Sequence, residues 1–242
     1  MTEREKRVQW FQSARFGMFL HWGLYAIPGR GEWYMSEAKI PAEQYEQYMQ
    51  EFTAKAYDPR DWARCAKRAG MQYVVLTAKH HDGFCLFDSK LTDYKSTNAP
   101  CGRDLVREFV DAVRAEGLRV GLYYSLIDWH HPDFPKYNDL NHPMRGNPAY
   151  RDEKIDFDRY LAYMHGQIEE LVTNYGKIDI LWFDYAYDEL RGEAWRATEL
   201  IRMVRRHQPD VILDNRLETS GEGFGSLVTE QPAYFSGDFV SP

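Results

Sequence analysis

The sequence of 242 residues lacks a disulfide framework, since its cysteines are odd in number and irregularly spaced: Cys65, Cys85 and Cys101. It has no excess of basic residues. The formal charge of -7 argues against a phosphate-binding surface and against nucleic acid as a partner. No apolar run approaches the roughly 20 residues that span a bilayer, so no membrane insertion is expected. The charged start at 1–7 lacks the apolar core of a signal peptide, which predicts a cytoplasmic protein.

Two patterns that serve cofactor chemistry are also missing. No glycine-rich phosphate loop follows the first apolar run at 16–20, which weakens a nucleotide-binding interpretation. The histidines show no His-x-His or similar ligand spacing. This disfavours a metal-dependent hydrolase, whose candidate ligands would be Asp184 with His21, His80, His81, His130 or His131.

What the sequence does have is enough apolar material for a sizeable core. Hydrophobic residues make up 44% and aromatic residues 15%, as in a globular protein. Three helical patterns end at a glycine, which suits the left-handed conformation that often closes a helix, and each gives way to an apolar run. The glycines are Gly70, Gly117 and Gly176, and the runs are 73–78, 120–126 and 178–183.

This alternation of helices and continuous apolar strands predicts an α/β fold with a buried parallel sheet. Two more strands fit at 16–20 and 211–213, the second after a helix over about 192–207, and 233–239 is a candidate sixth. The pattern favours a (β/α)8, TIM-like barrel over an open doubly wound sheet. Because eight strands cannot be counted, we expect 1–242 to be a catalytic barrel domain that is incomplete at its C-terminus.

Polar, titratable residues gather at the ends of the first two predicted strands. His21-Trp22-Gly23 follows one of them, and the run Lys79 to Phe84 follows the other. In a barrel of parallel strands the carboxyl ends meet at one mouth, where catalytic residues lie. These runs therefore predict an active site.

A carboxylate ends the strand that we expect at 178–183. Alternation sends Ile180, Trp182 and Asp184 to one face, so the indole and the carboxylate share a wall. A carboxylate above an aromatic ring suits attack on the anomeric carbon of a sugar, with the ring as a stacking platform. The spacing alone equally allows an aspartate that starts a turn.

Several strings, in this order, resemble the α-L-fucosidases, which are retaining glycoside hydrolases. They are Arg15–Gly23, Gly31–Tyr34, Lys79–Phe84, Tyr123–Ser125 and Leu181–Asp184, and they cover nearly the whole chain. The resemblance implies a catalytic barrel, usually followed by a β-sandwich domain, which we expect to be absent from 1–242. It also implies release of α-L-fucose from fucosylated glycans or glycosides by double displacement, without a metal or organic cofactor.

The resemblance further implies roles for individual residues. Asp184 aligns with the nucleophile of the family, and the positions that contact the sugar align with His21, Glu32, Trp33, His80, His81, Tyr124, Trp182 and Arg216. Fucose presents hydroxyls, which imidazole, carboxylate and guanidinium groups can hold, and a methyl group, which aromatic faces can cover. Neighbours in a strand point to opposite faces, so His80 and His81 both reach the sugar only if the strand has already ended.

The sequence departs from the family pattern at its carboxyl end. Retaining hydrolysis needs a second carboxyl group roughly 5 to 5.5 Å from the nucleophile. The acid/base glutamate of the family usually lies just beyond a string like 236–242, where this sequence stops, and Glu218, Glu222 and Glu230 are the alternatives. We therefore expect impaired hydrolysis, and a fucose-binding pseudoenzyme is the second hypothesis. The sequence leaves linkage, aglycone and oligomeric state open, including a homo-oligomer.

Overall fold

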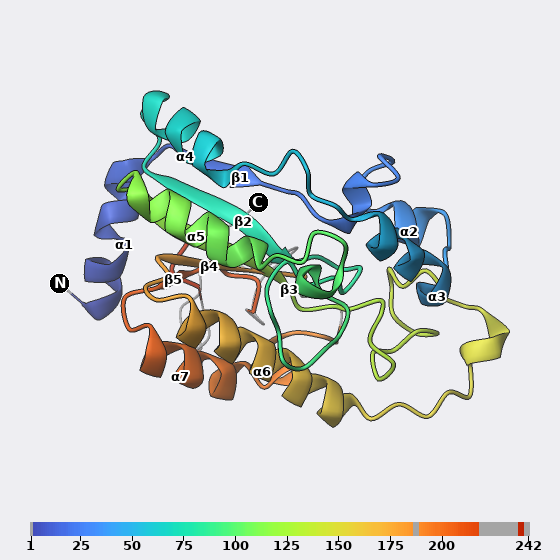
Figure 1. The fold of residues 1–242 in the computed structure, drawn as a ribbon. Coiled ribbons are helices and arrows are strands. Elements are labelled where there is room, and N and C mark those ends of the chain that lie inside the picture. Colours follow the sequence, from blue (N-terminus) through green and yellow to red (C-terminus); the bar gives the residue numbers. More distant parts are fainter. Residues whose placement is uncertain (1, 186–188, 218–236, 240–242) are drawn as a thin grey trace.

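A computed structural model describes residues 2–185, 189–217 and 237–239. Its centre is a parallel sheet in which each strand pairs with the next one along the chain, in the order β1-β2-β3-β4-β5 (Figure 1). This confirms the predicted α/β class and the parallel sheet of a (β/α) barrel. The strands are β1 (Gly17–Leu20), β2 (Tyr73–Lys79), β3 (Arg119–Ser125), β4 (Ile180–Asp184) and β5 (Ile212–Leu213).

The sheet is open among the described residues, because β1 pairs only with β2 there. Beyond β5, Phe239 forms a parallel bridge with Asp214, which places the end of the predicted sixth strand beside the sheet. The rest of that run lies outside the described residues. Register is regular except between β2 and β3, where it shifts between Thr77 and Lys79.

The helices alternate with the strands as the sequence predicts, and Gly70, Gly117 and Gly176 follow three of them with positive φ angles. Asp58, Asp104 and Asp156 cap helices by accepting a backbone N–H bond from the third helical residue. The α-helices are α1 (Glu3–Ala14), α2 (Tyr34–Glu37), α3 (Ala42–Tyr45), α4 (Pro59–Arg68), α5 (Leu105–Ala115), α6 (Phe157–Asn174) and α7 (Ala197–His207). The 3-10 helices are η1 (Leu24–Ala26), η2 (Glu46–Glu51), η3 (Ser96–Asn98), η4 (Pro148–Tyr150) and η5 (Gly192–Trp195).

The two faces of the sheet have different partners. Leu76, Leu122 and Leu181 point outward into the main core, which helices α4 to α7 cover (Figure 1). Val75 and Ile180 point to the inner face, where they form a smaller cluster that includes Val8 of α1. Because strand residues alternate between faces, this division decides which side chains of each strand can reach the site.

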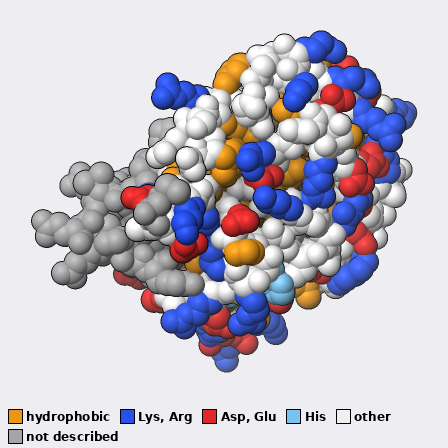
Figure 2. All heavy atoms as spheres, turned by 90° about the vertical axis from the view of Figure 1, so that its left-hand side faces the viewer, with side chains coloured by type: hydrophobic (Ala, Val, Ile, Leu, Met, Phe, Trp, Pro, Cys, Tyr) orange, Lys and Arg blue, Asp and Glu red, His pale blue; other side chains and the backbone are white. Residues whose placement is uncertain are grey.

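Helix α1 lies at the end of the sheet where the strands begin. Its Trp10 contacts the ring of Tyr73 at the start of β2 and the guanidinium of Arg119 at the start of β3. Figure 2 shows this side of the molecule, where Lys and Arg side chains lie among Asp and Glu. In the described part of the chain, no helix is long and apolar enough to cross a membrane. The opposite end, where the strands finish, carries the clustered histidines.

Candidate active site

Asp184 ends β4 with both carboxylate oxygens engaged. Its Oδ1 lies 2.7 Å from Nη1 of Arg216, and its Oδ2 accepts a 2.5 Å hydrogen bond from the hydroxyl of Tyr123. The Asp184 side chain keeps 15% of its surface exposed. Burial and the charge of Asp184 raise the pKa of Tyr123 well above its ordinary value, so the phenol stays a proton donor. The result is a fixed carboxylate that is still accessible.

The tyrosine beside this carboxylate is Tyr123, whereas the resemblance to the family named its neighbour Tyr124 as a position that contacts the sugar. Tyr124 lies on the outer face of β3, fully buried, and its hydroxyl donates to Gln167 of α6. The correction follows from the pleat, because neighbours in a strand point to opposite faces. The sequence did hold a signal: Val120, Leu122 and Tyr124 alternate as an apolar outer face, which leaves Tyr123 to the inner one.

Both adjacent histidines join the cluster, because β2 ends at Lys79 just before them. Their ring centroids lie 4.0 Å apart, and the ring of His80 lies 4.8 Å from that of His21. Nε2 of His81 lies 3.7 Å from Oδ2 of Asp184. Burial lowers the pKa of His81 to about 4 and that of His80 well below its ordinary value. Both imidazoles are therefore neutral at pH 7.

Aromatic rings form a wall beside His81. The ring of Trp33 lies 5.0 Å from His81 and 5.5 Å from Trp129. Tyr185, directly after the carboxylate, contacts the same imidazole at 5.2 Å and has a φ of 80°, a left-handed conformation that costs energy in a residue with a Cβ. Trp129 and Tyr185 were not among the site residues named from the sequence, although Tyr185 directly follows Asp184.

The remaining predicted residues are His21, Glu32 and Trp182. Loss of hydration lowers the pKa of His21, while the negative charges of Glu32 and Asp184 act in the opposite direction. Trp182 lies on the same face as Asp184, as predicted, and its ring contacts Phe19 at 5.2 Å. Glu218, Glu222 and Glu230, the candidates for a second carboxyl group, lie outside the described residues.

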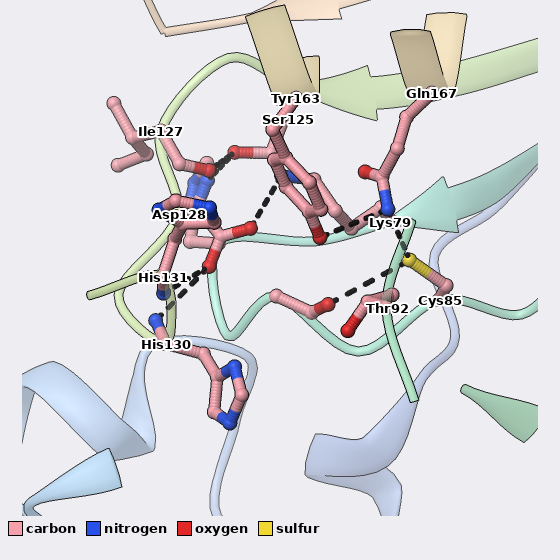
Figure 3. A network of polar contacts seen from close by, with 12 residues as sticks. Lys79, Cys85, Thr92, Ser125, Ile127, Asp128, His130, His131, Tyr163 and Gln167 are labelled. Atoms are coloured by element: carbon pink, nitrogen blue, oxygen red, sulfur yellow. Dashed lines mark hydrogen bonds and ion pairs between the residues drawn. The ribbon is translucent and has the colours of Figure 1, made fainter. Parts of the chain in front are cut away.

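A buried ion pair joins Lys79, at the end of β2, to Asp128, in the loop after β3 (Figure 3). Nζ of Lys79 lies 2.8 Å from Oδ2 of Asp128, and the two side chains are 0% and 1% exposed. Burial raises the pKa of Asp128, but the charges of Lys79, His130 and His131 and the hydrogen bond from Lys79 together outweigh it and keep the pKa below its ordinary value. Asp128 Oδ1 accepts from the amides of His130 and His131. These bonds fasten the end of β2 to the loop that follows β3.

The geometry gives no metal site within the described ranges, where no group of three or more His, Cys, Asp or Glu residues could hold an ion. His130 stacks on Tyr94 at a centroid distance of 4.1 Å, and His131 contacts Tyr163. Their rings thus have partners other than Asp184. What the site offers is a held carboxylate with neutral hydrogen-bonding rings and aromatic surface, which suits a sugar.

Comparison with known proteins points to one family. The family model described as alpha-L-fucosidase matches residues 1–232. Tissue alpha-L-fucosidase of Rattus norvegicus is 33% identical over 230 residues, which cover 86% of this chain and 46% of that protein. Plasma alpha-L-fucosidase of Homo sapiens is 30% identical over 254 residues, which cover 96% and 50%. The chain spans about half the length of these curated relatives.

Solved structures give the same result. Alpha-L-fucosidase isoenzyme 1 from Paenibacillus thiaminolyticus is 60% identical with a TM-score of 0.95, over 100% of this chain and 56% of that one. The alpha-L-fucosidase AlfC from Lactobacillus casei is 34% identical with a TM-score of 0.79, over 91% of this chain and 72% of that one. Together with the family match, these likenesses show that this chain belongs to the α-L-fucosidase family.

Proposed function

We propose that this chain carries the sugar-binding and nucleophilic part of a retaining α-L-fucosidase, which releases terminal α-L-fucose from fucosylated glycans or glycosides. The observation that carries the proposal is the carboxylate of Asp184, held by Arg216 and Tyr123 at the mouth end of β4. The likeness to fucosidases supports the choice of fucose as the sugar. A variant of the related AlfC has been solved in complex with Fuca(1,6)GlcNAc, a fucoside.

In the proposed reaction, a carboxylate oxygen of Asp184 attacks the anomeric carbon of fucose, and the bond to the leaving oxygen breaks as that oxygen takes up a proton from an acid. Water then attacks the same carbon and gives up a proton, the bond to Asp184 breaks, and fucose leaves with its original anomeric configuration. Arg216 and Tyr123 hold the carboxylate in one orientation, which reduces the entropy lost on reaching the transition state. Asp184 loses its negative charge when it bonds the sugar and regains it when that bond breaks. Arg216 and Tyr123 therefore also stabilise the carboxylate as a leaving group in the second step.

The other residues are assigned to binding. His21, His80, His81 and Glu32 hold the hydroxyls of the sugar, and Trp33 and Trp182 cover its apolar parts. Neutral imidazoles suit this role because each has one donor and one acceptor nitrogen, which matches a hydroxyl. Tyr124, whose hydroxyl is bound to Gln167 on the outer face, is not assigned to the sugar.

Covalent trapping tests the proposal. Incubation with 2-deoxy-2-fluoro-fucosyl fluoride followed by intact-mass measurement and peptide mapping should give one fucosyl adduct, on Asp184. Fluoride leaves without a protonating partner, so this probe reports on the nucleophile alone. Asp184→Asn should stay unlabelled, and a chelator should leave the labelling unchanged.

The other outcomes have distinct meanings. An adduct on another residue would remove the role given to Asp184. An unlabelled protein that still binds fucose would indicate a binding protein in place of a hydrolase.

A further inference from the structure

The two nitrogens of the His81 ring have different surroundings. Nδ1 lies 2.7 Å from Oγ of Ser125, the last residue of β3, whereas Nε2 faces Oδ2 of Asp184 at 3.7 Å. The first distance is a hydrogen bond and the second is too long for one. His81 is 1% exposed and Ser125 is 0% exposed, so water cannot replace the serine as the partner of Nδ1. Whether Nδ1 donates or accepts therefore depends on Ser125.

Counting hydrogens answers that question. The Ser125 hydroxyl has one hydrogen and is hydrogen-bonded to the carbonyl oxygen of Ile127 at 2.7 Å. Figure 3 draws this contact as a dashed line. A carbonyl can only accept, so the serine hydrogen is committed to Ile127. Oγ then meets His81 with its lone pairs, and Nδ1 of His81 must be the donor. Because burial keeps this ring neutral at pH 7, Nε2 carries no hydrogen.

Two other histidines have the opposite arrangement. Nδ1 of His142 accepts from the amide of Met144 at 3.0 Å, and Nδ1 of His131 accepts from the amide of Asp133 at 3.1 Å. In their neutral form both rings therefore carry the hydrogen on Nε2. His142 and His131 thus provide an internal reference for the opposite tautomer.

We propose that Ser125 is a positioning residue that holds His81 in the Nδ1–H tautomer and so keeps a bare Nε2 beside Asp184. The functional consequence rests on the proposed fucosidase reaction. A bare Nε2 accepts a hydrogen bond from a sugar hydroxyl and donates none to the carboxylate. With the other tautomer, Nε2–H needs to move less than 1 Å closer to bond Oδ2, since the two atoms lie 3.7 Å apart. That bond would draw electron density from the nucleophile.

Nitrogen NMR of the imidazole rings tests the tautomer directly, and a His81→Gln variant assigns the signals. In the unaltered protein, His81 should show a hydrogen on Nδ1 and none on Nε2, while His142 shows the reverse. Ser125→Ala should convert His81 to the Nε2–H form or to a mixture. Ser125→Thr, which keeps the hydroxyl, should retain the Nδ1–H form.

Ser96→Ala is the matched control. The Ser96 side chain is also buried and donates to a backbone carbonyl, that of Arg103, at 2.8 Å, and it lies on η3, a different segment from those that carry His81 and Asp184. This variant should leave the spectrum of His81 unchanged. A purely structural effect of losing one buried serine hydroxyl would appear in both alanine variants.

The functional arm compares the rate constants for trapping by 2-deoxy-2-fluoro-fucosyl fluoride. Ser125→Ala should label about tenfold more slowly, since one misdirected hydrogen bond at a reacting group costs at least that much. Ser125→Thr and Ser96→Ala should each be labelled with a rate constant more than half that of the unaltered protein.

The outcomes separate this inference from the proposed function. An Nε2–H ring in the unaltered protein, or an unchanged ring in Ser125→Ala, overturns the assignment of Ser125 even if trapping succeeds. A changed tautomer with an unchanged trapping rate overturns its role in the reaction. If the unaltered protein is not labelled at all, the proposed function fails, and the spectrum still decides the tautomer. If Ser125→Ala does not fold, the spectrum of the unaltered protein still tests the Nδ1–H tautomer of His81.

Discussion

At the scale of single residues, the buried pair of Lys79 and Asp128 stands out because neither charge contacts water. Lys79→Met leaves Asp128 as an unpaired buried carboxylate, and we expect it to lower the free energy of unfolding by about 3 to 5 kcal/mol. The double variant Lys79→Met/Asp128→Asn keeps an oxygen that accepts from the amides of His130 and His131. Its free energy of unfolding should fall by less than that of Lys79→Met. Urea unfolding monitored by circular dichroism measures both.

The exposed ion pair of Lys6 with Glu3 in α1 supplies the control for that experiment. Lys6→Met should change the free energy of unfolding by no more than about 1 kcal/mol, because water screens exposed charges. Equal losses for Lys79→Met and Lys6→Met would show that burial of the Lys79 pair does not matter.

A second prediction at this scale concerns pH. Burial lowers the pKa of His142 from 6.5 to about 4, so between these values the unfolded chain takes up a proton that the folded one does not. The stabilisation is complete above pH 6.5 and is lost as the pH falls toward 4. His142→Gln should therefore weaken the loss of stability over this range, which urea unfolding at a series of pH values will show. An identical pH profile for the variant would contradict the assignment.

Asp82 should act in the opposite direction. Burial raises its pKa from 3.8 to about 7, so the folded state holds a proton that the unfolded state releases between these values. Its contribution to stability therefore grows as the pH falls from 7 toward 4. The pH dependence of the free energy of unfolding of the whole protein is the sum of such contributions. The contribution of His142 is therefore read from the difference between the unaltered protein and His142→Gln, in which the contribution of Asp82 cancels.

At the scale of elements, helix starts depend on caps. Asp104 caps α5 by accepting from the amide of Arg107 at 2.9 Å, and it also accepts from the hydroxyl of Tyr175 at 2.7 Å. Asp104→Ala should lower the free energy of unfolding by about 2 kcal/mol, at the upper end for a cap, because a second bond is lost. Asp58→Ala removes the cap of α4, whose carboxylate accepts from the amide of Asp61 at 3.0 Å, and should cost about half as much because one bond is lost.

Urea unfolding again provides the measurement for these cap variants. Trapping of Asp184 should proceed at the same rate in both, since the caps lie away from it. If Asp58→Ala cost as much as Asp104→Ala, the bond to Tyr175 would have no net value.

The elements themselves were largely predictable, because apolar runs and helix-closing glycines are local signals. The start of α6, at Phe157, was not. Both Asp152 and Asp156 are suitable caps. The second is used because Asp133 accepts from its amide at 3.1 Å and also binds Arg159 in the first turn of α6. A contact from another part of the chain thus decided between two equivalent local signals.

At the scale of the whole molecule, the three free thiols report on folding. Cys65 is exposed, whereas Cys85 is buried and burial raises its pKa to about 12. A thiol reagent such as Ellman's should modify Cys65 in the native protein at once and Cys85 only after global unfolding. Cys85→Ser provides the assignment of the slow phase. Simultaneous reaction of Cys65 and Cys85 under native conditions would show that the core opens readily.

The sequence by itself determined the class of the fold, the strands and the place of Asp184 beside Trp182, because strand alternation and strand ends are local properties. It also carried the family, through short strings such as Arg15–Gly23. Alternation along β3 held the signal that places Tyr123 on the face of Asp184. Only the tertiary structure decided that its hydroxyl bonds this carboxylate, that Lys79 pairs with Asp128, and that Ser125 holds His81. These contacts join different strands or the segments that directly follow them, and which side chains meet depends on the register between strands, which no local pattern encodes.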